Sequence, residues 1–203
     1  MAAEQQRPDV AARRGQWQAD QAGLPVEQLV FIDETGLTTN MVRRYGRAPQ
    51  GQRLVDRTPH GHWKTTTFVS ALRHDRLTAP MVVDGPMNSA VFLAYVRQVL
   101  VPTLNAGNIV VMDNLSSHKA AGVRQAIEAV GARLVYLPPY SPDYNPIEMA
   151  YSKLKWLVRS AAQRTVEGLW SLVGRLLNQF PAGECRRYLR HCGYTMTPIR
   201  NAL

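Results

Sequence analysis

Three acidic residues occupy unusual positions in the sequence, directly after apolar runs or a proline-rich turn. Asp33 and Asp113 each follow an apolar, mostly β-branched run, L-V-F-I-D and I-V-V-M-D. Glu148 follows the proline-rich turn L-P-P-Y-S-P-D-Y-N-P-I-E, where an amphipathic helix is expected to start. An unpaired buried carboxylate is energetically costly. We therefore interpret the three acids as ligands that converge on divalent metal.

Phosphodiester chemistry would account for such a carboxylate set. Two divalent ions about 4 Å apart stabilise charge on both the attacking and the leaving oxygen, and Mg²⁺ prefers carboxylate and water ligands. Asp33 is the candidate bridge between the ions, and Asp113 and Glu148 would each complete the shell of one ion. The ions would activate a water for attack on a phosphodiester.

The expected helix after Glu148 places cations beside that acid. At 100° per residue, Lys155 and Arg159 fall within about 40° of Glu148 around the helix axis, which suits a DNA phosphate held next to metal. A separate apolar stripe is expected to face the core, formed by Ile147, Tyr151, Leu154, Val158 and Ala161. The alternative is a solvated basic face with a glutamate favoured by the helix dipole.

Further polar residues near the acids are candidates for supporting roles. Asn114 and His118, at positions i and i+4, could orient water or DNA, although His118 could equally make an ordinary hydrogen bond near a helix start. Asn145 is predicted to cap the helix that carries Glu148. Asp143 is a rival for the third acid, but its S-P-D-Y-N-P context also suits an aspartate in a turn.

The elements that must position these residues follow from apolar periodicity and turn signals. Glu34 should point to the opposite side of its strand from Asp33. Strands are predicted over residues 28–33, 65–72, 77–83, 108–113 and 132–137. Helices are predicted over residues 11–22, 90–104, 116–130 and 145–164, with one or two more in 166–192. This order predicts an α/β fold, a mixed five-stranded sheet flanked by helices.

A basic, loop-rich insertion is expected over residues 36–64, with room for a short hairpin. Its glycines and prolines are turn formers, and its arginines are interleaved among them. The candidate DNA contacts there are Arg43, Arg44 and Arg47, joined elsewhere by Lys119, Lys155 and Arg159. Any single one of these cations could instead be plain surface charge.

The composition narrows the class of protein. At 203 residues, 45% of them hydrophobic, the chain can form one globular domain. Its net charge of +9 favours a polyanionic partner, most simply nucleic acid. No apolar run approaches the roughly 20 residues of a membrane span, and the first residues lack an apolar signal core. The two cysteines fit a reducing cytoplasm, with a metal site at Cys185, His191 and Cys192 as a remote alternative.

Three of the stretches above, taken together, resemble the mariner-like superfamily of DDE transposases, and most of all its bacterial insertion-sequence branch. They are F-I-D-E-T-G, V-V-M-D-N-L-S-S-H-K and L-P-P-Y-S-P-D-Y-N-P-I-E, with 34 residues between Asp113 and Glu148, a spacing typical of that superfamily. The resemblance covers roughly residues 28–192. It implies a ribonuclease-H-like fold, Asp33, Asp113 and Glu148 as the metal-binding triad, and Mg²⁺ or Mn²⁺ as cofactor, two ions per site. The implied reaction is cleavage of DNA strands at the ends of an insertion sequence, followed by attack of the released 3′-hydroxyl on target DNA.

The same resemblance sets expectations for domains and partners. Residues 1–27 are interpreted as a lead-in or linker, 28–165 as the catalytic domain and 166–203 as its helical extension. Relatives usually carry helix-turn-helix domains ahead of the catalytic domain, so we expect a separate or upstream one here. The expected partners are double-stranded DNA, both element ends and target, and a second copy in a dimer on DNA. The expected location is the bacterial cytoplasm, in association with the nucleoid.

Three other functions stay open at this stage. D-E-T-G at 33–36 loosely resembles phosphatases with a D-X-D-X-T motif, but Thr35 stands where their second acid would be. A simple metal-dependent nuclease would use the same acids without strand transfer. A DNA-binding or assembly protein derived from an inactive transposase would use only the positive charge.

Overall fold

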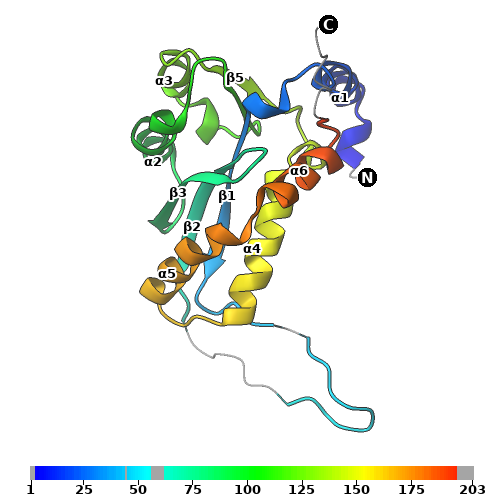
Figure 1. The fold of residues 1–203 in the computed structure, drawn as a ribbon, viewed down its shortest axis with the longest axis vertical. Helices are drawn as coiled ribbons and strands as arrows, with labels where there is room; N and C mark the ends of the chain where they lie inside the picture. Colours follow the sequence, from blue (N-terminus) through cyan, green and yellow to red (C-terminus); the bar gives the residue numbers. More distant parts are fainter. Residues whose placement is uncertain (1–2, 44, 56–61, 196–203) are drawn as a thin grey trace, which may run out of the picture.

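The computed structural model describes residues 3–43, 45–55 and 62–195, and its centre is a mixed five-stranded sheet (Figure 1). The strands lie in the order β3-β2-β1-β4-β5. Their bounds are β1 Leu29–Thr38, β2 Thr65–Leu72, β3 Leu77–Asp84, β4 Ile109–Met112 and β5 Arg133–Tyr136. The predicted mixed α/β sheet with flanking helices is confirmed.

The pairing of the strands combines a meander with two parallel crossovers. β1 pairs antiparallel with β2, and β2 pairs antiparallel with β3. β1 also pairs in parallel with β4, which in turn pairs in parallel with β5. Pro80 lies in β3, at the edge of the sheet, where a missing N–H costs least.

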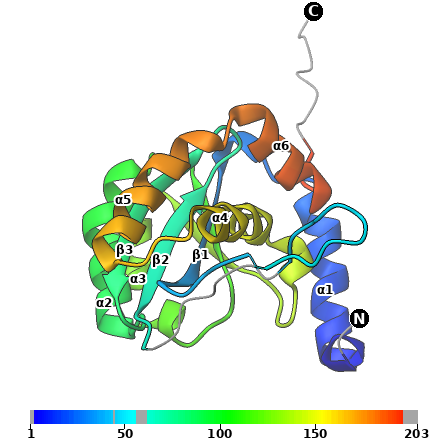
Figure 2. The same ribbon diagram turned by 90° about the horizontal axis from the view of Figure 1, so that it is seen from below.

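Helices cover both faces of the sheet (Figure 2). Their bounds are α1 Pro8–Gln21, α2 Ser89–Tyr95, α3 Val123–Glu128, α4 Ile147–Ala161, α5 Val166–Leu176 and α6 Ala182–His191, with a π-helical turn at Val96–Leu100. Short 3₁₀ turns lie at Ala3–Gln6, Val26–Gln28, Val101–Thr103, Ser117–Lys119, Pro142–Tyr144 and Leu177–Gln179. Asn88 caps α2 by accepting a hydrogen bond from the Val91 N–H.

Alternation along β1 divides the core into two parts. Leu29 and Phe31 face the core formed with α4, α5, α6 and α1. Val30 and Ile32 face the core formed with α2, the π-helical turn and α3. Because side chains alternate along a strand, Asp33 belongs to the α4 side of the sheet, and the residue after it belongs to the α2 side.

The first strand is longer than predicted. The sequence suggested that it ends at Asp33, but β1 runs on to Thr38 because its pairing with β2 continues to Thr38↔Thr65. Its parallel pairing with β4, by contrast, stops at Ile32↔Met112. Asp33 therefore marks the end of the pairing on one side of the strand only.

The helix predicted over residues 116–130 is mostly wrong. The structure has a 3₁₀ turn at Ser117–Lys119, and the α-helix begins only at Val123. Gly122 precedes it with a φ of 92°, a left-handed conformation that a regular helix cannot include. Asn114 and His118 therefore do not lie one turn apart on a common helix.

The basic insertion forms the long connection between the antiparallel partners β1 and β2, and it projects away from the sheet (Figure 1). Its described residues 39–43, 45–55 and 62–64 contain no strand, so the short hairpin is not seen among them. Arg44 lies outside the described residues. Among the residues that are described, no helix is long and apolar enough to cross a membrane.

Candidate active site

The parallel register between β1 and β4 brings two of the three acids to the same place. The last paired residues are Ile32 and Met112, and Asp33 and Asp113 follow them directly on adjacent strands. Neighbouring strands lie about 4.8 Å apart. Phe31 and Val111, two residues before them, face the α4 side of the sheet, so alternation assigns both carboxyl groups to that side. They lie at the carboxyl ends of parallel strands, where open α/β sheets bind ligands.

Asp33 is held by hydrogen bonds to both carboxylate oxygens. Oδ1 accepts from the backbone N–H of Glu34 at 2.8 Å, and Oδ2 accepts from Nδ2 of Asn145 at 2.9 Å. Its backbone carbonyl accepts from the hydroxyl of Tyr151 on α4 at 2.6 Å. Burial raises the pKa of Asp33 to about 7; the Glu34 N–H opposes the rise, and the nearby acids, Asp113 first among them, add to it.

Asp113 is linked to the opposite side of the sheet through a buried histidine. Nδ1 of His118 lies 2.6 Å from Oδ1 of Asp113, close enough for an ion pair, although its angles fall outside those of a regular hydrogen bond. Nε2 of the same ring lies 2.8 Å from Oε2 of Glu34. The His118 side chain has no exposed surface, and it packs on the Phe92 ring at 4.4 Å between centroids.

Two carboxylates around one imidazole decide the charge state of that imidazole. Burial alone would lower the pKa of His118, but contact with Asp113 and Glu34 raises it to about 10. The ring is therefore a buried cation at neutral pH. Glu34 points away from Asp33, as predicted, but its partnership with His118 was not foreseen.

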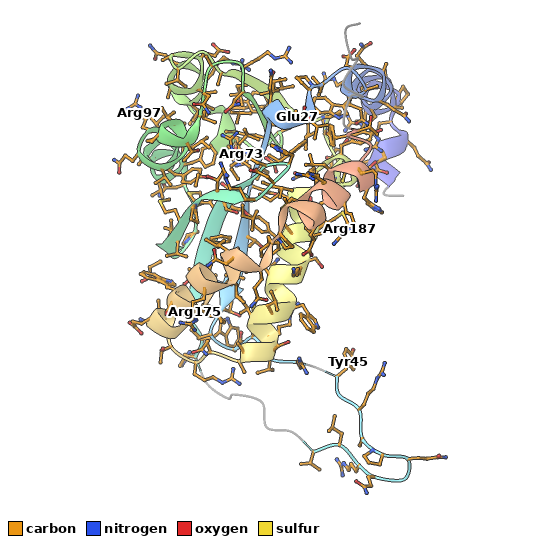
Figure 3. The ribbon with its side chains drawn as sticks, viewed as in Figure 1. Glu27, Tyr45, Arg73, Arg97, Arg175 and Arg187 are labelled. Atoms are coloured by element: carbon orange, nitrogen blue, oxygen red, sulfur yellow. The ribbon has the colours of Figure 1, made fainter. Side chains whose placement is uncertain are left out.

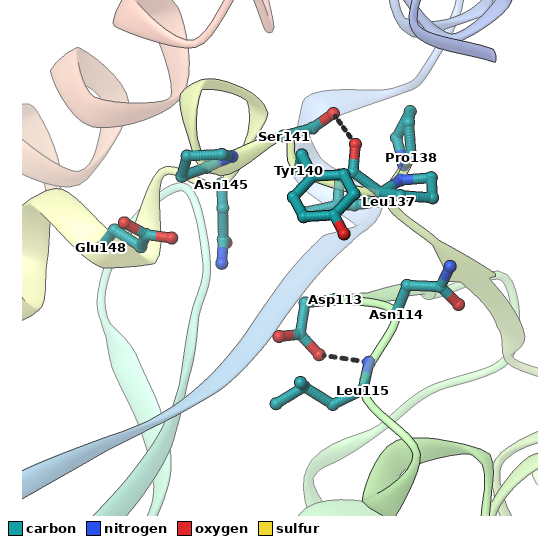
Figure 4. Close-up of a pocket in the computed structure, with 11 residues that line it drawn as sticks. Asp113, Asn114, Leu115, Leu137, Pro138, Tyr140, Ser141, Asn145 and Glu148 are labelled. Carbon is teal, nitrogen blue, oxygen red and sulfur yellow. Dashed lines mark hydrogen bonds between the residues drawn. The ribbon is translucent and has the colours of Figure 1, made fainter. Parts of the chain in front are cut away.

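Glu148 lies in the first turn of α4 and borders three pockets, two of which are also lined by Asp113 or Asp33. The first, of about 420 Å³, is lined by Asp113, Asn114, Asn145, Glu148 and the turn around Tyr140. In Figure 4 the Asp113 carboxylate faces the side of this pocket on which Asn145 and Glu148 lie. The second, of about 400 Å³, is lined by Asp33, Glu148, Lys155 and Arg159 among others.

Burial and the charges around Glu148 change the pKa of its carboxyl group. The residue is exposed overall, but partial burial of its carboxyl group raises its pKa. The negative charge of Asp113 adds to this rise, and Lys155 opposes it. Like charges that raise one another's pKa are stabilised by a cation placed between them.

The chemistry of the three carboxylates suits a hard divalent ion, but their spacing does not yet form a single metal site. Carboxylate oxygens at the end of a parallel strand pair are the ligands that Mg²⁺ and Mn²⁺ prefer. Among the residues that the structure describes, however, no three His, Cys, Asp or Glu side chains are grouped closely enough to hold one ion. Asp33 also has both oxygens engaged by protein donors. A shared metal would therefore require the three carboxylates to come closer together.

Two predictions about the turn before α4 have different outcomes. Asn145 does not cap the helix, because Pro146 occupies the N-cap position and the Asn145 side chain binds Asp33 instead. Asp143, the rival third acid, forms a two-pronged ion pair with Arg14 of α1 at 2.7 and 2.9 Å. That pairing lowers the pKa of Asp143, whereas the pKa of Glu148 is raised.

Several of the candidate DNA contacts gather next to the acids. Arg159 lines the pocket that holds Asp33 and Glu148, and it also lines a larger one of about 870 Å³ with Arg43, Arg47 and Trp156. Arg43 lies over the Trp156 ring at 5.6 Å and binds the Ser160 hydroxyl. A basic surface thus continues from the acids toward the insertion.

The remaining candidates lie elsewhere. Lys119 stands 5.9 Å from the Tyr136 ring on β5 and lines none of these pockets. Ala161, predicted to face the core from α4, is exposed, while the other four members of that stripe are buried. Cys185 and Cys192 are buried free thiols.

Tyr151, which the sequence assigned only to the core, also makes hydrogen bonds beside the acidic site. Its hydroxyl donates to the Asp33 carbonyl and accepts from the backbone N–H of Ser70 at 3.0 Å, so it joins α4 to β1 and β2. Its position one turn after Glu148 was visible in the sequence, but the partners of a buried hydroxyl are not.

The fold is similar to solved structures of one transposase. The structure is similar to the Mos1 mariner paired-end complex with Mn, with a TM-score of 0.74 and 16% identity over 92% of this chain and 60% of that chain. It is similar to the catalytic domain of Mos1 mariner transposase, with a TM-score of 0.64 and 14% identity over 95% and 90% of the two chains. It is also similar to the Mos1 Strand Transfer Complex, with a TM-score of 0.72 and 15% identity over 91% and 58%.

These similarities, at low identity, establish a ribonuclease-H-like fold of the kind found in the Mos1 catalytic domain, as predicted. The chain spans little more than half of the Mos1 chains in the complexes, 56% in the paired-end complex with the left transposon end. A search of curated proteins found no similar sequence.

A sequence profile of the DDE superfamily endonucleases matches residues 28–169, from just before β1 into α5. The matched segment holds all three acids, the insertion and the turn before α4. Since it spans well over half of the chain, the protein belongs to the DDE endonuclease superfamily.

Proposed function

We propose that this chain is the catalytic domain of an insertion-sequence transposase, which cleaves DNA with divalent metal and joins the released 3′ end to target DNA. Membership of the DDE endonuclease superfamily supports the reaction class. The observation that carries the proposal is the placing of the acids: Asp33 and Asp113 follow the last parallel pair of β1 and β4, and Glu148 borders a pocket with each.

In this proposal the three acids hold two Mg²⁺ or Mn²⁺ ions, with Asp33 as the shared ligand. The bound ions would supply positive charge for activating a water and for stabilising the leaving oxygen. Solved Mos1 structures are described as complexes with Mn and with Mg. Asn145 would orient Asp33, and His118 would orient Asp113, through the contacts that they make in the structure.

The basic surface beside the acids would carry the DNA backbone. Lys155 and Arg159 line the pocket of Asp33 and Glu148, and Arg43 and Arg47 extend it toward the insertion. One similar solved structure is described as a Mos1 paired-end complex with the left transposon end, and another as a pre-cleavage Mos1 transpososome. We propose element ends and target DNA as partners, a dimer on DNA, end recognition by a separate or upstream helix-turn-helix domain, and action in the bacterial cytoplasm at the nucleoid.

A plasmid assay tests the metal-dependent reaction. The purified chain should nick supercoiled DNA with Mg²⁺ or Mn²⁺ and not with EDTA. Asp33→Asn, Asp113→Asn and Glu148→Gln should each abolish nicking. Glu27→Gln, at an exposed residue that lines neither pocket of the aspartates (labelled in Figure 3), is the matched control and should remain active. Substantial activity in any of the three variants would remove that residue from the proposed site.

A second assay separates a transposase from the alternatives. Pre-cleaved duplex ends with a free 3′-hydroxyl should become covalently joined to target plasmid. Nicking without joining would leave a simple nuclease. Salt-sensitive DNA binding with neither reaction would leave a DNA-binding protein derived from a transposase, since any strongly basic protein binds DNA in this way.

A further inference from the structure

The turn between β5 and α4 carries the residues that complete the acidic site. Residues 138–145 form this turn, which includes the 3₁₀ segment Pro142–Tyr144. Asn145 at its end binds Asp33, and Glu148 follows three residues later in the first turn of α4. The position of both groups therefore depends on what holds the turn.

One arginine of α1 binds the turn at several points. Nη1 of Arg14 donates to the Ser141 hydroxyl at 2.8 Å and contacts the Tyr140 carbonyl at 3.4 Å. The two Nη atoms form a fork with the Asp143 carboxylate at 2.9 and 2.7 Å. The guanidinium also stacks over the Tyr144 ring, 4.7 Å from its centroid. Four residues of one turn are thus joined to a single side chain 126 or more positions earlier.

The geometry of this contact differs from that of an ordinary surface ion pair. Exposed pairs contribute little because their side chains stay mobile and solvated. The Asp143 carboxylate is 48% exposed, but the Arg14 side chain is only 16% exposed. The planar fork of Arg14 matches the carboxylate while one face rests on an aromatic ring. Such a site fixes orientation as well as distance.

The helix that presents Arg14 is itself anchored. Nε1 of Trp17 donates to the Tyr194 hydroxyl at 3.2 Å, and that hydroxyl donates to the Tyr144 carbonyl at 2.8 Å. Near the start of the chain, Gln5 donates to the Tyr140 carbonyl at 2.7 Å. The turn is therefore held by α1, by Gln5 ahead of that helix, and by Tyr194, which lies shortly after α6.

We propose that Arg14 is a positioning residue of the acidic site: by clamping the turn at Tyr140, Ser141, Asp143 and Tyr144, it sets where Asn145 and Glu148 stand relative to Asp33. The inference rests on the proposed metal-dependent function. It makes α1, which precedes the segment matched by the family, a part of the framework of the site.

Metal binding and amide exchange test this role in the full chain. Arg14→Gln should weaken Mn²⁺ binding, measured by isothermal titration calorimetry, on the order of tenfold, as losses of outer-shell partners do. Hydrogen exchange should rise in residues 138–148 and stay unchanged in β1 and β4. Arg14→Lys should fall between wild type and Arg14→Gln, because one ammonium cannot reproduce the fork and the stacking.

Arg13→Gln is the matched control, since it removes the same charge from an exposed neighbour on the same helix. Mn²⁺ affinity within about twofold of this control in Arg14→Gln would overturn the proposal. If Arg14→Gln fails to fold, Asp143→Asn removes the forked partner while keeping α1 intact, and the same comparison decides.

The metal and cleavage readouts separate this inference from the proposed function. Normal Mn²⁺ binding and DNA nicking by Arg14→Gln would overturn the positioning role and leave the function standing. A wild-type chain that binds Mn²⁺ more tightly than Arg14→Gln, but neither nicks nor joins DNA, would overturn the function and support the positioning role. A wild-type chain that binds no Mn²⁺ would overturn both.

Discussion

The side-chain amide of Asn145 donates a hydrogen bond of 2.9 Å to Oδ2 of Asp33, across 112 residues of sequence. It ties the turn before α4 to the strand that holds the central acid of the proposed site. Asn145 is only 3% exposed, so the donor end of this bond is shielded from water. A shielded hydrogen bond to a carboxylate is stronger than a neutral one.

Loss of this bond should affect activity more than stability. Asn145→Ala frees Oδ2 of Asp33 and leaves the turn without its link to β1, so we expect cleavage to fall on the order of tenfold. Metal-dependent nicking rates and thermal unfolding of the same samples check this. Asn145→Asp places another negative charge beside Asp33 and should lower both quantities further. A nicking rate for Asn145→Ala equal to that of wild type would contradict the orienting role.

Removal of His118 should destabilise the metal-free fold strongly. The imidazolium pairs with Glu34 on one side of the sheet and with Asp113 at its end, and it has no exposed surface. His118→Ala leaves two carboxylates without their cation, and breaking a buried pair in this way costs about 3–5 kcal/mol. Urea denaturation measures the loss.

A double variant tests the cause of that loss. Glu34→Gln combined with His118→Gln removes both charges of one pair, so its free energy of unfolding should exceed the value expected from adding the single losses. Lys119→Ala, one residue along and exposed, serves as the control. Additive losses would mean that the pairing contributes little.

The cations beside the acids should set the salt dependence of DNA binding. Lys155 and Arg159 line the pocket of Asp33 and Glu148. If each contacts one phosphate of a duplex, replacing both with Gln should reduce the slope of log K against log salt by about 1.8, since each contact contributes about 0.9. Fluorescence anisotropy across a salt series measures the slope.

The control for that experiment removes the same charge elsewhere. Arg97 in the π-helical turn and Arg175 in α5 are exposed and lie away from the pockets of the acids (Figure 3). The Arg97→Gln and Arg175→Gln double variant should keep the wild-type slope. Equal slopes for the two double variants would indicate binding by net charge alone.

A pH-dependent contribution to stability is expected where α4 meets α6. Burial would raise the pKa of Glu184, but hydrogen bonds from Lys153, at 2.6 Å, and from the Tyr188 hydroxyl lower it below the ordinary 4.5. For an acid with a lowered pKa, the stabilisation is present above the ordinary pKa and is lost as the pH falls through the folded-state pKa.

Glu184→Gln should therefore lower the free energy of unfolding near neutral pH, by about 1 kcal/mol or a Tm change of about 2–4 °C. The difference from wild type should shrink below pH 4.5. Thermal unfolding of both proteins between about pH 3.5 and about pH 7 provides the test. A difference that does not change with pH would point to packing in place of charge.

Local patterns were enough for most of the fold. β2 begins and ends at the predicted residues 65 and 72, because its apolar run and flanking polar residues are local features. α4 buries Tyr151, Leu154 and Val158 as its periodicity indicates. The helix predicted over residues 116–130 begins only at Val123, after the left-handed Gly122. The contact of His118 with Glu34, which lies 84 positions earlier, is not visible in the local pattern.

The sequence alone determined the order of the strands and helices along the chain, and placed Asp113 after β4 and Glu148 at the start of α4, because alternation, periodicity and turn chemistry act over a few residues. Only the tertiary structure decided that Asn145 holds Asp33, that His118 joins Glu34 to Asp113, and that Arg14 clamps the turn before Glu148. These contacts join residues that are distant in the chain. A polar side chain can satisfy its hydrogen bonds with many possible partners, and chain folding selects among them through the packing of the whole core.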